Sequence, residues 1–163
     1  MNPPMIRENA DGHMLLGVLR QTHDAVLKIR QNELRRYGLS PEQNAALMNI
    51  KVLGKNASIV ELSRRLFRKS NSTTVLVMRL EKRGLIKKTR DRYRKNTIRL
   101  TLTSQGKKCL QRAVREDSFN DIINEFDHEK RKQLCELLGQ LRDHALDYLH
   151  VDMETYSDFF TRV

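Results

Sequence analysis

Apolar residues recur about every 3.6 positions in the first part of the chain, between residues 13 and 36. This period predicts a long amphipathic helix, because residues three and four apart share one face of an α-helix. Gly38 follows the last apolar position, and glycine favours the left-handed turn that ends many helices. We therefore expect one long helix that stops before Gly38.

Start signals predict three shorter helices in the part of the chain that follows. Residues 40–43 read Ser-Pro-Glu-Gln, which places an N-cap serine, an N1 proline and an N3 glutamine in order, so a helix should run from there to about Leu53. Residues 58–61 repeat the capping box and begin a short helix. A tight turn then leads to the cap-forming residues 70–72, where a third helix begins that stops at Gly84.

The period changes after the third helix. β-branched residues become frequent between residues 85 and 103, and the second half of this segment alternates between apolar and polar side chains. This pattern predicts two strands joined by a charged tip at residues 90–96. Helical periodicity resumes from residue 104 to 126, and a last helix carries the leucines between residues 134 and 149.

Together these elements predict a mainly α fold with a small β-hairpin wing. Two short helices joined by a tight turn and followed by a hairpin make a winged helix-turn-helix lobe, here residues 40–103. The long helices from both termini, residues 13–36 and 104–150, carry apolar stripes outside this lobe, so we expect a helical dimerisation region. The alternative is that they pack on one another within one chain. Residues 151–163 form a C-terminal tail without a clear period.

The charge is concentrated in the middle of the chain. The net charge is +11 and the isoelectric point is near 10.0. Residues 64–115 hold 18 lysines and arginines against only Glu81 and Asp91, a net charge of +16, which leaves −5 for the rest of the chain. Such a block favours a polyanion as partner, because each phosphate that a cation neutralises releases condensed counterions.

The sequence argues against a membrane partner. No apolar run approaches the roughly 20 residues that a membrane-spanning helix needs, and the basic block is interrupted by Gly84 and the predicted hairpin, which disfavours a membrane-surface helix. The N-terminus shows no basic-then-apolar secretory pattern. We therefore expect a cytoplasmic protein whose partner is double-stranded DNA.

The second helix of the motif and the wing are the expected DNA contacts. In winged helix-turn-helix proteins the second helix enters the major groove, while a basic wing reaches phosphates or the minor groove. The start of that helix is small and polar, which suits close approach to base edges, although N-capping alone would also explain some of these residues. Val75 could meet a thymine methyl group. The expected DNA contacts are Ser70, Asn71, Ser72, Thr74, Val75, Arg79, Arg90, Arg92, Arg94 and Lys95.

Two motifs resemble the MarR (multiple antibiotic resistance regulator) family of winged helix-turn-helix regulators. Residues 80–86 read Leu-Glu-Lys-Arg-Gly-Leu-Ile, similar to the element that closes the recognition helix in that family, and residues 102–106 read Leu-Thr-Ser-Gln-Gly, similar to the element after the wing. The resemblance covers residues 13–150. The family's Asp-x-Arg pair before the second strand is missing, because Arg94 and Asn96 occupy its positions; Asp91 could pair with Arg94 instead.

The resemblance implies a homodimeric transcriptional regulator, usually a repressor and often released by a small-molecule effector. A dimer whose two recognition helices meet successive major grooves should bind a near-palindromic operator. The effector and its binding residues are not predicted. The alternative is a winged-helix module for RNA or a protein partner. Such a module should expose apolar residues on the second helix, where Val75 and Met78 are the only candidates.

The sequence shows no motif for catalysis, for metal binding or for cofactor binding. The five histidines show no HxxxH spacing, and no Cys/His cluster has zinc-finger spacing. Cys109 and Cys135 form no CxxC pair, so we expect two small buried hydrophobes on helices. Cys109 lies among three cations, which makes a thiol sensor the alternative at that position. We therefore expect a protein that is not an enzyme and needs no metal or cofactor.

Overall fold

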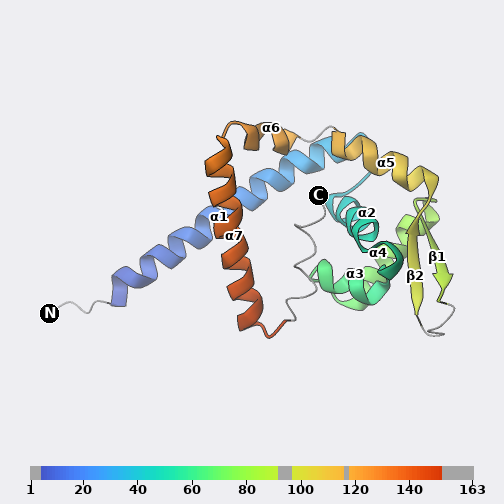
Figure 1. The fold of residues 1–163 in the computed structure, drawn as a ribbon, viewed down its shortest axis with the longest axis horizontal. Coiled ribbons are helices and arrows are strands. Elements are labelled where there is room, and N and C mark those ends of the chain that lie inside the picture. Colours follow the sequence, from blue (N-terminus) through green and yellow to red (C-terminus); the bar gives the residue numbers. More distant parts are fainter. Residues whose placement is uncertain (1–4, 92–96, 116–117, 152–163) are drawn as a thin grey trace.

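The computed structural model describes residues 5–91, 97–115 and 118–151. Helices dominate this part of the chain, and one antiparallel hairpin stands at the edge of a helical lobe (Figure 1). The elements are α1 (Met5–Arg35), α2 (Pro41–Leu53), the 3-10 turn η1 (Gly54–Asn56), α3 (Ile59–Arg65), α4 (Ser70–Lys82), β1 (Ile86–Arg90), β2 (Ile98–Leu102), α5 (Ser104–Arg115), α6 (Ser118–Asn124) and α7 (His128–Tyr148).

The predicted start signals of α2 and α3 are confirmed. The Ser40 hydroxyl accepts a hydrogen bond from the Gln43 amide at 3.2 Å, and the Gln43 side chain accepts one from the Ser40 amide, which completes the capping box. At α3 the Ser58 hydroxyl accepts from the Glu61 amide at 3.2 Å. These bonds satisfy amide groups that have no partner inside the helix, and they fix where each helix begins.

Two helix boundaries differ from the sequence-based prediction. Helix α1 begins at Met5, eight residues before the predicted start at residue 13. The segment 104–126, predicted as continuous helix, divides into α5 and α6. The amide of Ser118, the first residue of α6, donates to a side-chain oxygen of Glu33 on α1 at 2.9 Å. A tertiary contact therefore anchors the start of α6. Hydrophobic periodicity does not reveal such a contact, so it did not predict this boundary.

The hydrophobic core lies inside the winged helix-turn-helix lobe. It joins α2, α3, α4 and the hairpin, with the C-terminal end of α1 and one face of α5 closing it. Burial of this apolar surface is the main force that holds the lobe together. The largest side chains buried here are Leu34, Leu47, Ile50, Leu62, Leu80, Leu85 and Leu100.

The two family-like motifs meet at the base of the hairpin. Gly84 ends the α4 turn with φ +69°, a left-handed conformation that glycine adopts without strain. The Thr103 hydroxyl donates to the Gly84 carbonyl at 2.6 Å and accepts from the Gly106 amide at 3.0 Å. A Cβ atom on Gly106 would collide with the Leu85 carbonyl. The motifs therefore form one joint between the recognition helix, the wing and α5.

A part-buried ion pair fastens α1 to α5 and α6. Arg30 and Glu33 lie one turn apart on α1 and pair at 2.7 Å, with side chains only 14% and 13% exposed. Arg30 also donates to the Ala113 carbonyl on α5 at 3.3 Å, and Glu33 holds the Ser118 amide on α6. Burial raises the pKa of Glu33, but the hydrogen bonds from Ser118 and Arg30 and the charge of Arg30 outweigh burial and leave this pKa below its ordinary value of 4.5.

This lowered pKa makes the joint sensitive to acid. An ionised Glu33 stabilises the fold fully above pH 4.5, and this contribution is lost as the pH falls through the lowered folded-state pKa. We expect Glu33→Gln to reduce the free energy of unfolding by about 1–3 kcal/mol at pH 7. Urea unfolding of both proteins from pH 7 to pH 3 should show this difference shrinking only below pH 4.5. A difference that stays constant over the whole range would contradict the assignment.

Helices α1 and α7 carry apolar residues that the described chain leaves exposed. Helix α1 extends far beyond the lobe (Figure 1), and its residues Met14, Leu15, Leu16 and Val18 are 52–67% exposed. On α7, Leu137, Leu138 and Leu141 are 40–63% exposed. In the described part of the chain no helix is long and apolar enough to span a membrane. The apolar stripes predicted for both terminal regions therefore exist as unpaired surfaces of the single chain.

Candidate nucleic-acid interface

The start of α4 is not capped by its own small polar residues. The N-cap position is Lys69, which makes no side-chain capping bond, and Ser70 is the first helical residue. The Thr73 hydroxyl is buried and donates to the Lys69 carbonyl at 3.3 Å, while the Thr74 hydroxyl donates to the Ser70 carbonyl at 2.9 Å. N-capping therefore does not account for the cluster of small polar residues at this helix start.

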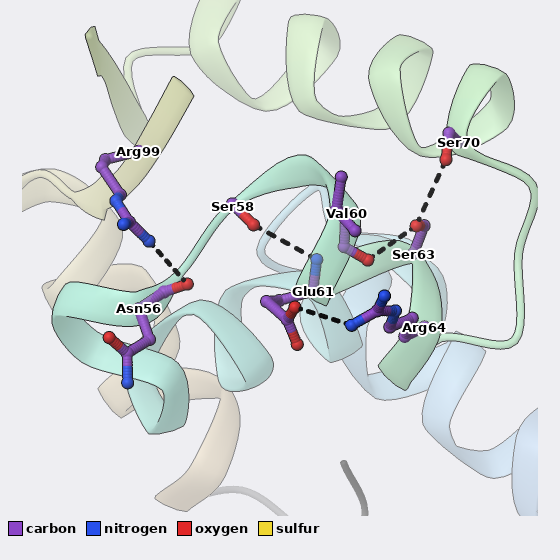
Figure 2. A network of polar contacts seen from close by, with 8 residues as sticks. All are labelled: Asn56, Ser58, Val60, Glu61, Ser63, Arg64, Ser70 and Arg99. Atoms are coloured by element: carbon purple, nitrogen blue, oxygen red, sulfur yellow. Dashed lines mark hydrogen bonds and ion pairs between the residues drawn. The ribbon is translucent and has the colours of Figure 1, made fainter. Parts of the chain in front are cut away.

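A chain of polar contacts sets α4 against α3. Figure 2 shows Ser63 of α3 between two partners: its hydroxyl donates to the Val60 carbonyl at 2.8 Å and lies 3.5 Å from the Ser70 hydroxyl. Glu61 receives a hydrogen bond from Arg64 at 3.1 Å on the outer side of the same short helix. Ser70, predicted as a DNA contact, is thus also part of the joint that orients the recognition helix.

The outward face of α4 runs from polar to apolar to cationic. Asn71, Val75, Met78 and Lys82 follow one another at spacings of four, three and four residues, so they line one face of the helix, and all four are exposed. Thr73, Leu76, Val77 and Leu80 are buried on the opposite face. Ser72 and Arg79 are exposed as predicted, whereas Thr74 is half-buried and its hydroxyl proton is already donated.

The C-terminal end of α4 is tied to the junction between α1 and α2. Arg83 donates to the Gly38 carbonyl at 2.7 Å, to the Gln43 side chain at 3.0 Å and to the Tyr37 carbonyl at 3.3 Å. Hydrogen bonds from a charged donor are the stronger class in proteins. The recognition helix is therefore fastened at its start to α3 and at its end to the base of α1.

The wing is a five-residue antiparallel ladder that presents cations at its outer end. Ile86 pairs with Leu102 at the base and Arg90 pairs with Ile98 near the tip. Arg90 is exposed, as expected of a residue that meets phosphates. The other predicted wing contacts, Arg92, Arg94 and Lys95, lie outside the described residues, and so does the Asp91–Arg94 pair that the sequence suggested.

Asp91 holds Arg99 of the second strand. The Arg99 Nε donates to the Asp91 carboxylate at 2.5 Å, and the same guanidinium donates to the Asn56 carbonyl at 3.3 Å (Figure 2). The Leu100 amide adds a bond to the Ala57 carbonyl at 2.9 Å. These contacts link the wing to the loop before α3. Arg99 is not among the residues predicted from the sequence, where its only signal is a cation inside an alternating strand.

Comparisons with known proteins identify this architecture. No protein-family model matches the sequence. The HTH-type transcriptional regulator YsmB of Bacillus subtilis is 27% identical over 125 residues, which cover 72% of this chain and 85% of YsmB. The organohalide-sensing regulator RdhR-CbdbA1625, in a structure with bound 2,4-dichlorophenol, superposes with a TM-score of 0.76 at 26% identity over 92% of this chain and 90% of its own. Sco5413, a MarR family regulator from Streptomyces coelicolor, has the same fold, with a TM-score of 0.71 at 21% identity over 85% and 97% of the two chains.

The chain resembles HTH-type transcriptional regulators in sequence and has the fold of a MarR family regulator. Its α3 and α4 are the helix-turn-helix of a MarR-type lobe, α4 is the recognition helix, and β1 and β2 form the wing. The mainly helical fold with a hairpin wing that the sequence predicted is confirmed. The Asp91–Arg99 pair is an ion pair within the described part of this wing, whereas the family's usual Asp-x-Arg positions hold other residues.

The chain also contains a cavity that the sequence did not predict. It has a volume of about 510 Å³ and lies between the C-terminal end of α2, strand β2 and helix α5. Its apolar wall is formed by Ile50, Leu100, Leu102, Leu110 and Val114, and its rim carries three cations, Lys51, Lys107 and Arg115. These residues are far apart in the sequence, so no local motif predicts the cavity.

The two cysteines differ in their surroundings. Cys109 on α5 is half-buried and packs against the core of the lobe. Cys135 is exposed, so the prediction that both cysteines are buried was wrong for this residue. Cys135 lies on α7, whose apolar side chains Leu137, Leu138 and Leu141 are themselves exposed in the single chain. The thiol-sensor hypothesis for Cys109 stays a prediction.

The wing cation Arg90 offers a test of the electrostatic part of the interface. We expect Arg90→Ala to weaken binding to specific and scrambled duplexes about equally, and to flatten the slope of log K against log salt by up to about one unit for each protomer bound. Binding isotherms at three salt concentrations measure both quantities. Lys28→Ala removes one exposed cation from α1 and should leave the slope unchanged. A loss confined to the specific duplex would show that Arg90 reads sequence instead.

Proposed function

We propose that this protein is a homodimeric transcriptional regulator of the MarR type that binds a near-palindromic site in double-stranded DNA. The observation that carries the proposal is the recognition helix, whose Asn71, Ser72 and Arg79 are exposed beside a wing that ends in Arg90. Polar groups at the start of a helix suit base edges, and the cations suit phosphates. The protein is thus a binding protein of the cytoplasm, with no catalytic role.

The exposed helices outside the lobe support the homodimer. Apolar stripes on α1 and α7, which include Leu16 and Leu137 at 64% and 63% exposure, would be costly if they stayed in water. A second copy of the same chain supplies a matching surface by two-fold symmetry. Two recognition helices related by this symmetry would meet successive major grooves on one side of the duplex.

We further infer that the cavity between α2, β2 and α5 is the effector site. Its apolar wall and cationic rim suit a small amphipathic organic anion, with the ring on the wall and the charge toward Lys51, Lys107 and Arg115. The structural relative RdhR-CbdbA1625 was solved with 2,4-dichlorophenol, a small aromatic molecule. Helix α5 joins the lobe to the C-terminal helices, so an occupant that moved α5 against β2 would change the separation of the two recognition helices.

Selection from a random duplex pool tests the proposed function. We expect a recurrent sequence whose affinity exceeds that of a scrambled duplex by about 10³-fold or more at physiological salt. The same sequence as duplex RNA should bind like the scrambled DNA, because the major groove of A-form RNA is too deep and narrow for a helix. Equal affinity for enriched and scrambled duplexes would contradict the proposal and would favour a winged module for RNA or a protein partner.

A further inference from the structure

Two large apolar side chains are exposed in the middle of the recognition helix. Val75 is 47% exposed and Met78 is 56% exposed, although they lie on the face that should approach DNA. The spacing of three residues puts them side by side along α4, between Asn71 and Lys82. The buried face of α4 already carries its own apolar set, so neither side chain is needed for the core of the lobe.

A shallow hollow adjoins this apolar pair. It has a volume of about 420 Å³, with Val75 and Met78 on its floor and charged residues from α4 and β1 around it. Lys88 of β1 pairs with Glu81 at 2.7 Å, so the only acid at the hollow is held by a cation, while Arg79 and Lys82 add positive charge. An apolar floor inside a positive rim fits a nucleic acid that offers both phosphates and a small apolar group.

We propose that Val75 and Met78 read the 5-methyl groups of thymine in the major groove. This inference rests on the proposed function, because it requires α4 to lie in that groove. Thymine is the base whose major-groove edge carries a methyl group, and apolar side chains recognise it by contact. Asn71, four residues before Val75, can bond adenine N6 and N7 on the same stretch of duplex. The α4 face thus reads consecutive A·T pairs.

Replacement of thymine by uracil removes the methyl group and leaves base pairing intact. The probe is a duplex enriched from a random pool by the wild-type protein, synthesised again with one thymine at a time replaced by uracil. We expect the affinity to fall about fourfold at each contacted thymine, the effect of one methyl group returned to water. The sensitive positions should be few and should lie in the two half-sites.

Variants of the two side chains locate the contact. Val75→Thr keeps the shape of the side chain, and Met78→Gln keeps its length and its compatibility with a helix. Each should bind the thymine duplex about sixteenfold more weakly, fourfold for each of the two half-sites, and lose nothing further with uracil at its own position. Val60→Thr, at an exposed apolar residue of α3, should retain the full response to uracil.

The outcomes separate this inference from the proposed function. An enriched duplex whose uracil versions all bind the wild-type protein equally well would overturn thymine readout and leave DNA recognition standing. Variants that lose the same factor on thymine and uracil duplexes would also overturn it, because their effect would not act through the methyl group. A pool that yields no enriched duplex would overturn the proposed function and thymine readout together, and would favour a protein partner on this apolar face.

Discussion

Leu137→Glu is expected to convert the protein to a monomer and to weaken its binding to an enriched duplex by about 10²- to 10⁴-fold. Leu137 on α7 is 63% exposed in the single chain, so a charge there costs the folded protomer little. In a dimer the same position would be buried, and an unpaired carboxylate would oppose association. Without its partner each lobe holds only one half-site, and the gain from linked binding is lost.

Light scattering and binding isotherms measure the two parts of this prediction. The wild type should have twice the chain mass of 19.2 kDa at micromolar concentration, and the variant should have the chain mass itself. Lys132→Gln changes the net charge of α7 by the same amount, at an exposed position away from the leucine stripe, and should leave both mass and affinity unchanged. A wild-type protein with a mass near 19.2 kDa would refute the dimer.

Asn71→Ala is expected to weaken binding to the enriched duplex by about 1–3 kcal/mol and to relax discrimination at one base pair. Asn71 is exposed in the first turn of α4, and no hydrogen bond occupies its amide in the described part of the chain. The residue carries no charge, so the slope of log K against log salt should stay nearly unchanged. Removal of this side chain should therefore affect only the preferred sequence.

Isotherms on enriched and scrambled duplexes test this assignment. Asn32→Ala makes the same substitution at an exposed position of α1 and should bind both duplexes like the wild type. Circular dichroism should give both variants the wild-type helix content, because α4 has no side-chain cap to lose at Asn71. Equal losses on the two duplexes would mean that Asn71 supports the helix or the phosphate contacts and does not read bases.

Local signals in the sequence were sufficient to predict most of the lobe. The capping serines Ser40 and Ser58 each fix a helix start through a bond to a residue three positions away, so the pattern alone identified them. Gly84 of the first motif has an equally local cause, because it adopts a left-handed turn. The alternating strand after them predicted the hairpin. Interactions between residues that are close in the sequence are the ones that can be predicted from a single sequence.

The features that the sequence did not predict depend on contacts between different elements of the fold. The Asp91–Arg99 pair links the end of β1 to β2, and the Glu33–Ser118 bond joins residues that are 85 positions apart in the sequence. The cluster at residues 70–74 was attributed in part to capping, yet Lys69 is the N-cap, and Ser70 instead contacts α3. The cavity is formed by residues of α2, β2 and α5. Each of these features depends on how elements pack, which periodicity does not encode.

The spacing and symmetry of the enriched sequence test the central claim most directly. A dimer that places two α4 helices on one side of the duplex should select an inverted repeat whose half-sites are centred about 10 bp apart. Alignment of the sequences recovered from a random duplex pool gives both the symmetry and the distance. An inverted repeat at this spacing is the result that we predict. A single asymmetric element bound with full affinity would contradict a symmetric dimer that reads DNA through its two recognition helices.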